Sequence, residues 1–281
     1  MLKALQVLYM KIIGVIPARY ESSRFPGKPL ADICGKPMVW WVYRQCMKVQ
    51  EMDEVYVATD DVRIKQACEE NDVRVIMTSK EHKTGTDRVG EVAGKIAADL
   101  YVNIQGDEPL LEPDTIRAAI LPFYEDKQLE ITNLMTKIKN PVDVVNSTVP
   151  KVITNRDNVG IYLTRSMAPY PKGSIEYDYY KQVCVYGFKP EALRFFCEYG
   201  RRNGKAKIER IEDIEILRFI EGGYQVKYVE VCSETVAVDT ANDLEKVRNI
   251  VKLRGGGYKL IPLRSMLRHT LYQLEMSGGA A

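Results

Sequence analysis

The chain has 281 residues, of which 46% are hydrophobic, so it is long enough to bury a full core in one large domain or two lobes. Its 40 basic and 38 acidic residues leave a net charge of +2, which argues against a nucleic-acid-binding coat or an acidic tail. Only two histidines are present, which argues against a Ser-His-Asp triad and a multi-histidine zinc site. Chemistry in this chain must therefore depend on carboxylates, lysine, arginine and a hard metal ion.

The six cysteines are widely spaced and form no Cys-x-x-Cys pair, which is typical of reduced, buried thiols in a cytosolic protein. No secretory signal is evident at the amino terminus, and no apolar stretch is long enough to span a membrane. We therefore expect a cytoplasmic protein without a membrane span. The sequence leaves the start open between Met1 and Met10, and residues 1–10 are expected to form an N-terminal extension.

The first half of the chain alternates short apolar runs with helical patterns. Strands are predicted at 12–16, 55–58, 73–77 and 100–104, and helices at 38–49, 64–70 and 87–98. This alternation predicts an α/β fold with a mostly parallel, Rossmann-like sheet that helices cover on both faces. Ligands of such sheets bind outside the carboxyl ends of the strands. Arg19, Asp60 and Asp107 all follow predicted strands at that edge.

The pattern changes between residues 130 and 188, where strands follow one another without long helices. They are predicted at 131–138, 151–154, 159–164 and 179–188, which indicates a smaller, more antiparallel lobe inserted for the acceptor or for dimerisation. Apolar residues at every third position from Ile208 to Ile220 then indicate one helix. Strand character returns at 226–231 and 236–238, before a helix at 243–251. We expect a single domain over 11–251.

Residues 254–281 begin with a run of glycines and are predicted to form a C-terminal helical extension. Leucines at 263, 267, 271 and 274 give this extension an apolar seam, which could cover the core or a partner subunit.

A basic loop follows the first predicted strand and carries Arg19, Arg24 and Lys28. Arginine holds phosphate oxygens in a planar fork and lysine adds a mobile point charge, so three cations at a strand end favour a polyphosphate site. The loop is not a Walker A motif, because Pro29 follows Lys28 where that motif has serine or threonine. The alternative is a solvated basic loop that binds nothing, and the charges alone do not decide between the two.

Two aspartates also follow apolar runs. Asp107 lies in the segment Asn-Ile-Gln-Gly-Asp-Glu-Pro, and Asp239 lies in the segment Val-Ala-Val-Asp-Thr. Carboxylates beside a phosphate loop are the usual ligands of Mg²⁺, which binds carboxylate and phosphate oxygens together. Either aspartate alone would more simply cap a helix. With the basic loop in the same sheet layer, the magnesium interpretation is favoured. His82 is interpreted as structural, and Thr86 as the cap of the helix that follows it.

Five segments of the chain resemble, in the same order, the 3-deoxy-manno-octulosonate cytidylyltransferases, which activate the sugar acid Kdo as CMP-Kdo. They are residues 17–30, 58–61, 77–88, 103–109 and 238–240. The phosphate loop and the Gln-Gly-Asp-Glu-Pro segment are specific to this family. The resemblance implies a nucleotide-diphospho-sugar transferase fold, CTP as a substrate, Mg²⁺ as a cofactor, a homodimer and a place in lipopolysaccharide biosynthesis.

The resemblance also implies roles for individual residues. Arg19, Ser22 and Lys28 would hold the CTP phosphates, and Asp107 and Asp239 would carry Mg²⁺. The remaining predicted site residues would face the sugar acid, and they are Arg88, Gln105, Tyr186 and Glu209.

Two departures from the family pattern lie on the acceptor side. Gln182 stands where the family usually has histidine, and Arg210 follows Glu209 where the family has glutamine or histidine. Arg210 would add a permanent cation to the pocket, which suits an acidic acceptor, or would lie on the solvated face of its helix.

The sequence therefore predicts an enzyme in which an ulosonic acid attacks the α-phosphate of CTP in line, with Mg²⁺ assisting and diphosphate leaving. The acceptor would be Kdo or a close analogue. One alternative is CMP transfer to a different acid, such as another sugar acid or a phosphonate. The other is a non-catalytic nucleotide-binding protein, which would not need two metal-binding carboxylates.

Overall fold

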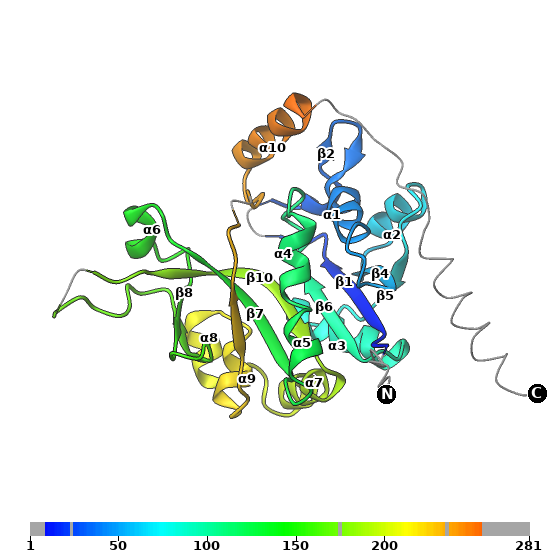
Figure 1. Ribbon diagram of the computed structural model, residues 1–281. Helices are drawn as coiled ribbons and strands as arrows, with labels where there is room; N and C mark the ends of the chain where they lie inside the picture. Colours follow the sequence, from blue (N-terminus) through cyan, green and yellow to red (C-terminus); the bar gives the residue numbers. More distant parts are fainter. Residues whose placement is uncertain (1–8, 23–24, 174–175, 234–235, 255–281) are drawn as a thin grey trace, which may run out of the picture.

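The structure is a computed structural model that describes residues 9–22, 25–173, 176–233 and 236–254. At its centre is a nine-stranded sheet, in which seven strands follow the order β11-β7-β10-β6-β1-β4-β5 (Figure 1). Arg24 of the basic loop, residues 1–8 and the predicted leucine seam lie outside the described residues. Within the described ranges, no helix is long and apolar enough to cross a membrane.

The parallel half of the sheet follows the sequence prediction closely. It consists of β1 (Ile12–Ala18), β4 (Glu54–Thr59), β5 (Val75–Met77) and β6 (Leu100–Ile104). β1 pairs in parallel with both β4 and β6, and β4 pairs in parallel with β5. These strands are rich in valine and isoleucine, which suit a sheet that is buried on both faces. Their carboxyl ends therefore meet at one edge.

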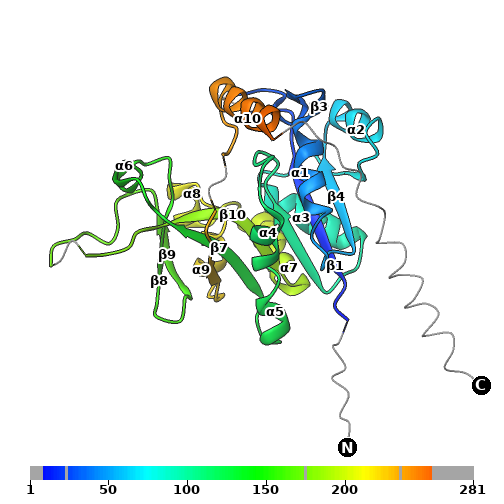
Figure 2. The same ribbon diagram turned by 45° about the horizontal axis from the view of Figure 1, so that its top comes forward.

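Helices cover both faces of the sheet, as predicted. α1 (Met38–Cys46), α2 (Val62–Glu69), α4 (Pro113–Ala118) and α5 (Pro122–Glu125) bury apolar side chains in one core cluster. α3 (Gly85–Lys95) and α7 (Pro190–Asn203), which was not predicted, pack into a second cluster on the opposite face. The sheet thus separates two cores (Figure 2).

The segment 130–188, predicted as an inserted lobe, does not form a sheet of its own. Its long strands β7 (Ile131–Lys137) and β10 (Tyr180–Phe188) lie inside the central sheet, where β10 runs antiparallel to both β6 and β7. The antiparallel hairpin of β8 (Lys151–Thr154) and β9 (Gly160–Thr164) attaches to the start of β10. Beside this hairpin are α6 (Pro141–Val145) and a projecting arm formed by 165–173 and 176–179 (Figures 1 and 2).

The prediction of one helix through 208–220 is wrong. The chain forms two short helices, α8 (Lys207–Glu212) and α9 (Leu217–Glu221), which are separated at Asp213 in a left-handed conformation with φ 52°. Apolar residues at every third position do not stay on one face of an α-helix, because the helix has about 3.6 residues per turn. The break places Glu215 in the turn between the two helices.

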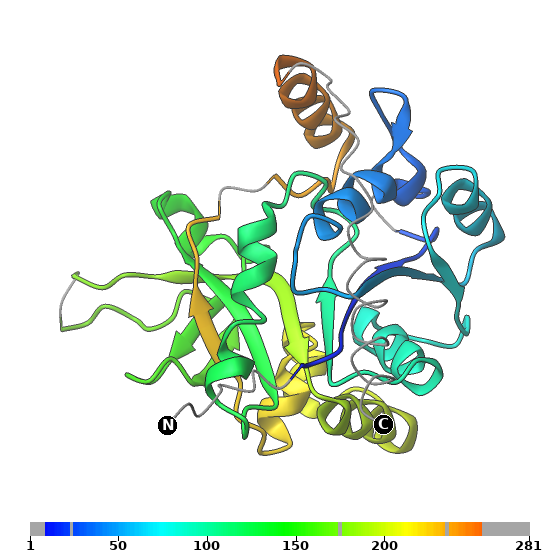
Figure 3. The same cartoon turned by 45° about the vertical axis from the view of Figure 1, so that its right-hand side comes forward.

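The last part of the chain returns to the sheet and then leaves it. β11 (Lys227–Glu230) pairs in parallel with β7, but 236–238 is not a strand as predicted. α10 (Ala241–Leu253) packs Leu244, Val247 and Val251 against Ile33 and other apolar residues of a third cluster. Ile33 belongs to the hairpin of β2 (Asp32–Ile33) and β3 (Lys36–Pro37), which lies beside α10 in Figure 3.

The packing of β10 gives a prediction for Gly187. A Cβ atom there would lie 2.6 Å from a ring carbon of Phe123 and 2.6 Å from Oγ1 of Thr132, and backbone would be close on a third side. We expect Gly187→Ala to lower the free energy of unfolding by about 1–3 kcal/mol, as overpacked cores do. Gly94→Ala is the matched control, because that helical site is open and alanine raises helix propensity by roughly 0.5–1 kcal/mol. Urea denaturation measures both, and equal stabilities would contradict the packing described.

Candidate active site

Three separate segments bring charged side chains together at the carboxyl edge of the sheet. The Nζ atom of Lys28 lies 2.8 Å from Oδ2 of Asp107 and 3.3 Å from Oδ1 of Asp239. The side chain of Lys28 is only 16% exposed, and those of Asp107 and Asp239 are 29% and 35% exposed. The structure therefore joins three residues that the sequence predicted as separate parts of a nucleotide site.

Local backbone structure fixes each of these three residues. Lys28 begins a short 3-10 helix, η1 (Lys28–Leu30), directly after Gly27, whose φ of 71° favours glycine. Gly106 lets Asp107 turn off β6, because a Cβ at Gly106 would lie 3.2 Å from the carbonyl oxygen of Pro17. The amide of Val238 donates to the carbonyl oxygen of Asp107 over 2.9 Å, which ties the segment before Asp239 to the end of β6.

The simpler interpretation of Asp239 as a helix cap is not supported. Thr240 is the N-cap of α10, and it forms a reciprocal capping box with Asp243. Asp239 precedes the cap, so its carboxylate contacts Lys28 instead. The same correction applies at α3, where Thr84 and not Thr86 is the cap and Asp87 completes the capping box.

The donor set at this edge fits Mg²⁺ bound together with phosphate. Two carboxylates reach the same ammonium group, so one cation can be close to both of them. No cluster of three or more metal-binding side chains occurs among the residues that the structure describes. Mg²⁺ commonly binds one or two carboxylates, substrate phosphates and water, whereas an all-protein cage is typical of other metals.

The rest of the basic loop is more open. The Arg19 side chain is exposed at the end of β1 and forms no ion pair with any residue in the described ranges. The hydroxyl oxygen of Ser22 accepts a hydrogen bond from the amide of Phe25 over 3.3 Å, so Ser22 shapes the loop locally. Arg19 thus retains its hydrogen-bond donors for a ligand.

One face of the sheet carries polar groups beside this edge. Gln182, Cys184 and Tyr186 alternate along β10 and share a face, and Gln182 lies beyond the carboxyl end of β6, since Val185 pairs with Ile104. Burial and the nearby carboxylates of Glu108 and Asp107 raise the pKa of the Cys184 thiol to about 12. This face of β10 is therefore close to Asp107.

Asn133 of β7 organises that face. Its Nδ2 atom donates to the carbonyl oxygens of Val183 and Val185, both over 2.9 Å, at an irregularity in the pairing of β7 with β10. Its Oδ1 atom accepts a hydrogen bond of 2.9 Å from Nε2 of Gln182. Because the Nδ2 atom of Asn133 donates to two carbonyls, its Oδ1 atom is the one that faces Gln182. The Gln182 amide therefore presents its Nε2 atom, which donates, to Asn133.

Arg88 is buried, and its guanidinium links the segments that follow β4 and β5. Its guanidinium donates to Oγ1 of Thr78 over 2.8 Å, to the carbonyl of Ser79 over 3.2 Å and to Oδ2 of Asp60 over 2.9 Å. These partners follow β4 and β5, whereas Asp107 follows β6 on the other side of β1. The structure therefore does not bring Arg88 together with Lys28 and Asp107.

Glu209, which was predicted to face the acceptor, takes part in a buried ion pair. Glu209 is fully buried, and both of its carboxylate oxygens accept hydrogen bonds of 2.7 Å from Arg218. A buried, paired carboxylate of this kind serves packing, because exposing it to a ligand would leave Arg218 unpaired. Arg210 points into solvent, where its guanidinium donates to the carbonyl of Lys205 over 3.4 Å. It adds no charge to a pocket.

A role for Glu215 was not predicted from the sequence, although its charge acts on Cys184 and Tyr186 of this face. Its oxygens accept hydrogen bonds from the amides of Gly85 and Thr86 at the start of α3 and from the hydroxyl of Thr86 over 2.7 Å. Burial raises the pKa of the Glu215 carboxyl. The Gln105 side chain is close to the same place, 4.0 Å from a Cβ built on Gly85. The sequence signal that could have identified Glu215 is the presence of a carboxylate inside the apolar run Ile-Glu-Ile-Leu.

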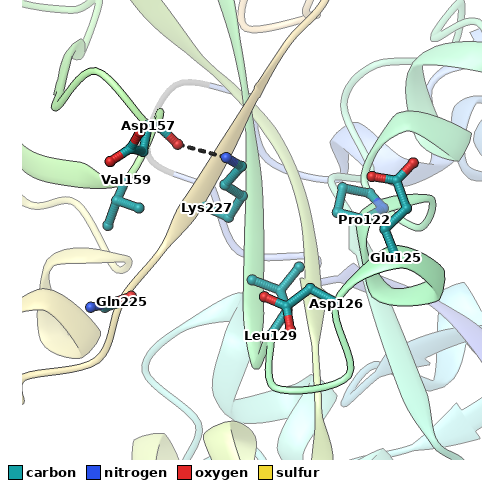
Figure 4. A pocket seen from close by; sticks show the side chains of 8 residues that line it. All are labelled: Pro122, Glu125, Asp126, Leu129, Asp157, Val159, Gln225 and Lys227. Atoms are coloured by element: carbon teal, nitrogen blue, oxygen red, sulfur yellow. Dashed lines mark hydrogen bonds between the residues drawn. The ribbon is translucent and has the colours of Figure 1, made fainter.

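His82 is structural, as predicted, because its Nε2 atom is paired with Oε2 of Glu91. One pocket of about 290 Å³ is not part of this site. It lies between α5, the turn of the β8–β9 hairpin and the start of β11, near the amino ends of β7 and β11 (Figure 4). Lys227 in this pocket donates to the carbonyl of Asp157. The pocket is at the opposite edge of the sheet from Asp107.

Comparisons with known proteins identify the family of the chain. The family model described as cytidylyltransferase matches residues 13–254. A 3-deoxy-manno-octulosonate cytidylyltransferase of Geobacter metallireducens is 41% identical over 85% of this chain and 96% of its own length. One of Fusobacterium nucleatum is 40% identical over 86% and 98%. The solved structure of a CMP:2-keto-3-deoxy-manno-octonic acid synthetase complexed with CTP has a TM-score of 0.81 and 37% identity, covering 87% of this chain and 99% of that one.

The family model spans residues 13–254, which include Lys28, Asp107 and Asp239, and the two relatives and the solved structure cover 85–87% of the chain. The chain is therefore a nucleotidyltransferase and belongs to the 3-deoxy-manno-octulosonate cytidylyltransferase family.

Proposed function

We propose that the chain transfers CMP from CTP to the anomeric hydroxyl of Kdo and releases diphosphate. The observation that carries the proposal is the contact of Lys28 with both Asp107 and Asp239 at the edge where ligands bind. The sequence relatives named for this reaction and the CTP-bound structural neighbour support it. Two carboxylates held beside a lysine also favour catalysis over simple nucleotide binding.

On this proposal the residues of the basic loop position CTP. The ammonium of Lys28 and the guanidinium of Arg19 donate charge-assisted hydrogen bonds to phosphate oxygens, and Ser22 keeps the loop in shape. The transferred phosphoryl group needs positioning and charge stabilisation, not covalent chemistry. A half-buried lysine suits this role, since its charge is screened less by water than that of an exposed one.

Asp107 and Asp239 are the residues that would hold Mg²⁺. The metal, when bound, lowers the pKa of the attacking hydroxyl and offsets negative charge on the leaving diphosphate. On the acceptor side, Gln105, Tyr186 and Gln182 would face the sugar acid, and Glu215 would hold the start of α3 in place beside it.

We also propose that the protein is a homodimer. Five large apolar side chains are exposed on the hairpin, on α6 and on the projecting arm, at the end of the molecule remote from α1 and α2 (Figures 1 and 2). They are Val142, Val145, Ile161, Tyr170 and Tyr177. Apolar side chains gathered on one surface are typical of a protein interface.

The metal ligands can be tested by removing each carboxylate. We expect Asp107→Ala and Asp239→Ala each to lower kcat by orders of magnitude, because charge on the diphosphate is then no longer offset. Diphosphate release at saturating CTP and Kdo measures this, and Mn²⁺ binding followed by electron paramagnetic resonance measures metal affinity separately. Asp60→Asn is the control for a carboxylate at a neighbouring strand end. Normal turnover of either alanine variant would remove that residue from the metal site.

Gln182 provides a test of the acceptor. Its amide does not titrate, so we expect the KM for Kdo to change little between about pH 6 and 8, whereas Gln182→His should introduce a pH dependence near the histidine pKa of about 6.5. Steady-state kinetics with Kdo, amino analogues, nonulosonic acids and phosphonates would identify the preferred acid. Activity with a phosphonate but not with Kdo would replace the proposed acceptor and leave the nucleotide chemistry unchanged.

The roles assigned to Glu209 and Arg210 can be separated by stability and kinetics. Arg218→Met leaves the buried Glu209 carboxylate unpaired, so we expect a loss of about 3–5 kcal/mol in the free energy of unfolding. Arg210→Ala, at an exposed position in α8, should stay within about 0.5 kcal/mol and keep its KM for Kdo. A large rise in that KM for Arg210→Ala would return Arg210 to the acceptor pocket.

A further inference from the structure

The basic loop is closed at its base by Tyr20 and Gly27. The amide of Gly27 donates to the carbonyl oxygen of Tyr20 over 2.8 Å. The Tyr20 ring covers Gly27 so closely that a Cβ there would lie 3.1 Å from two ring carbons. Arg19 and Lys28 are the residues immediately outside this closure. The Tyr20–Gly27 contact therefore sets the spacing of the two cations that are proposed to bind CTP.

Arg63, in the first turn of α2, covers the Tyr20 ring. Its Cζ atom lies 3.3 Å from the ring centroid, which is the geometry of a close cation–π contact. The same guanidinium forms a bidentate pair with Asp61, with distances of 2.9 Å from Nε to Oδ1 and 2.6 Å from Nη2 to Oδ2. Arg63 is thus held in a fixed orientation although its side chain is 56% exposed.

Asp61 in turn is anchored to the sheet. Its Oδ1 atom caps α2 by accepting a hydrogen bond of 2.9 Å from the amide of Arg63, and its own amide donates to Oγ1 of Thr59, the last residue of β4. The hydrogen bond from Arg63 lowers the pKa of Asp61 to about 2, so the carboxylate is ionised throughout the neutral range. A rigid connection therefore runs from the end of β4 through Asp61 and Arg63 to Tyr20.

We propose that Arg63 is a positioning residue for CTP binding, which acts through Tyr20 to hold the basic loop closed with Arg19 and Lys28 correctly spaced. The inference rests on the proposed function, in which that loop binds the CTP phosphates. Arg63 lies outside the five segments that resemble the cytidylyltransferase family, so its role is read from its contacts alone. Its donors face Asp61, which distinguishes it from Arg19.

The alternative role for Arg63 is a direct contact with phosphate. Substitution of Asp61 distinguishes this role from positioning through Tyr20. If Arg63 acts through Tyr20, Asp61→Asn weakens CTP binding, because the bidentate pair that orients the guanidinium is lost while asparagine still caps α2. If Arg63 binds phosphate directly, the same change releases its guanidinium from a competing carboxylate, and CTP binding stays equal or becomes tighter.

The experiment measures the Kd of CTP by isothermal titration calorimetry for wild type and five variants. We expect Arg63→Ala to raise the Kd about two- to fivefold, the range of an exposed cation–π contact, with kcat at saturating CTP unchanged. Asp61→Asn and Tyr20→Leu should show similar increases. Arg63→Ala combined with Tyr20→Leu should be no worse than either change alone, because the two act through one contact. Lys65→Ala, which removes another exposed cation from α2, should leave the Kd unchanged.

Two results would overturn the inference. One is an unchanged Kd of CTP for Arg63→Ala. The other is weaker CTP binding by Arg63→Ala together with unweakened CTP binding by Asp61→Asn, which would assign Arg63 to direct phosphate binding. Thermal unfolding of each variant checks that the fold is retained, which we expect because Arg63 is largely exposed. A wild-type protein that fails to bind CTP would instead refute the proposed function.

Discussion

The site depends on one ammonium group that neutralises two carboxylates from distant parts of the chain. Lys28 is separated by 79 residues from Asp107 and by 211 from Asp239, yet its Nζ atom is within 3.3 Å of both. Two half-buried carboxylates drawn to one place would repel each other without a nearby cation. The same charge balance prepares the site for a substrate that carries several phosphates together with a divalent metal. The elements around it can be understood as means of bringing these three charges together.

Loops that follow strands of the sheet supply two of these charges, and the segment before α10 supplies the third. Parallel pairing of β1 with β6 places the basic loop and the Gln-Gly-Asp turn at one edge, as in other α/β proteins. Asp239 lies on no strand, and it reaches the edge because α10 packs against the β2–β3 hairpin and because Val238 bonds to the backbone of Asp107. The apolar packing of α10 is thus a condition for the charge arrangement.

The parts of this arrangement that arise from local sequence were predictable, and those that arise from tertiary contacts were not. Alternating apolar runs gave the parallel strands β1, β4 and β6, and the residues at their ends gave Lys28 and Asp107. The helix break at Asp213 was missed, because spacing alone does not show a left-handed residue. The same break decides the partners of two carboxylates, since Glu209 pairs with Arg218 from the next helix and Glu215 accepts hydrogen bonds from the start of α3. Partners of buried charges are set by packing.

The acceptor side differs chemically from the nucleotide side. A row of paired residues crosses four strands on one face of the sheet, from Asn103 through Tyr186 and Asn133 to Tyr228. All four are buried or nearly so, and neither polar atom of the Asn103 side chain hydrogen-bonds to a described residue. Neutral amides and hydroxyls inside an otherwise apolar core cost stability unless they are hydrogen-bonded, as the Asn133 amide is to the carbonyls of Val183 and Val185. The charged residues Lys28, Asp107 and Asp239 thus lie at the strand ends, whereas the four residues of this row are neutral and lie within the sheet. Gln182 extends this neutral row in place of a titratable ring, so the substitution is consistent with the chemistry of the surface that it joins.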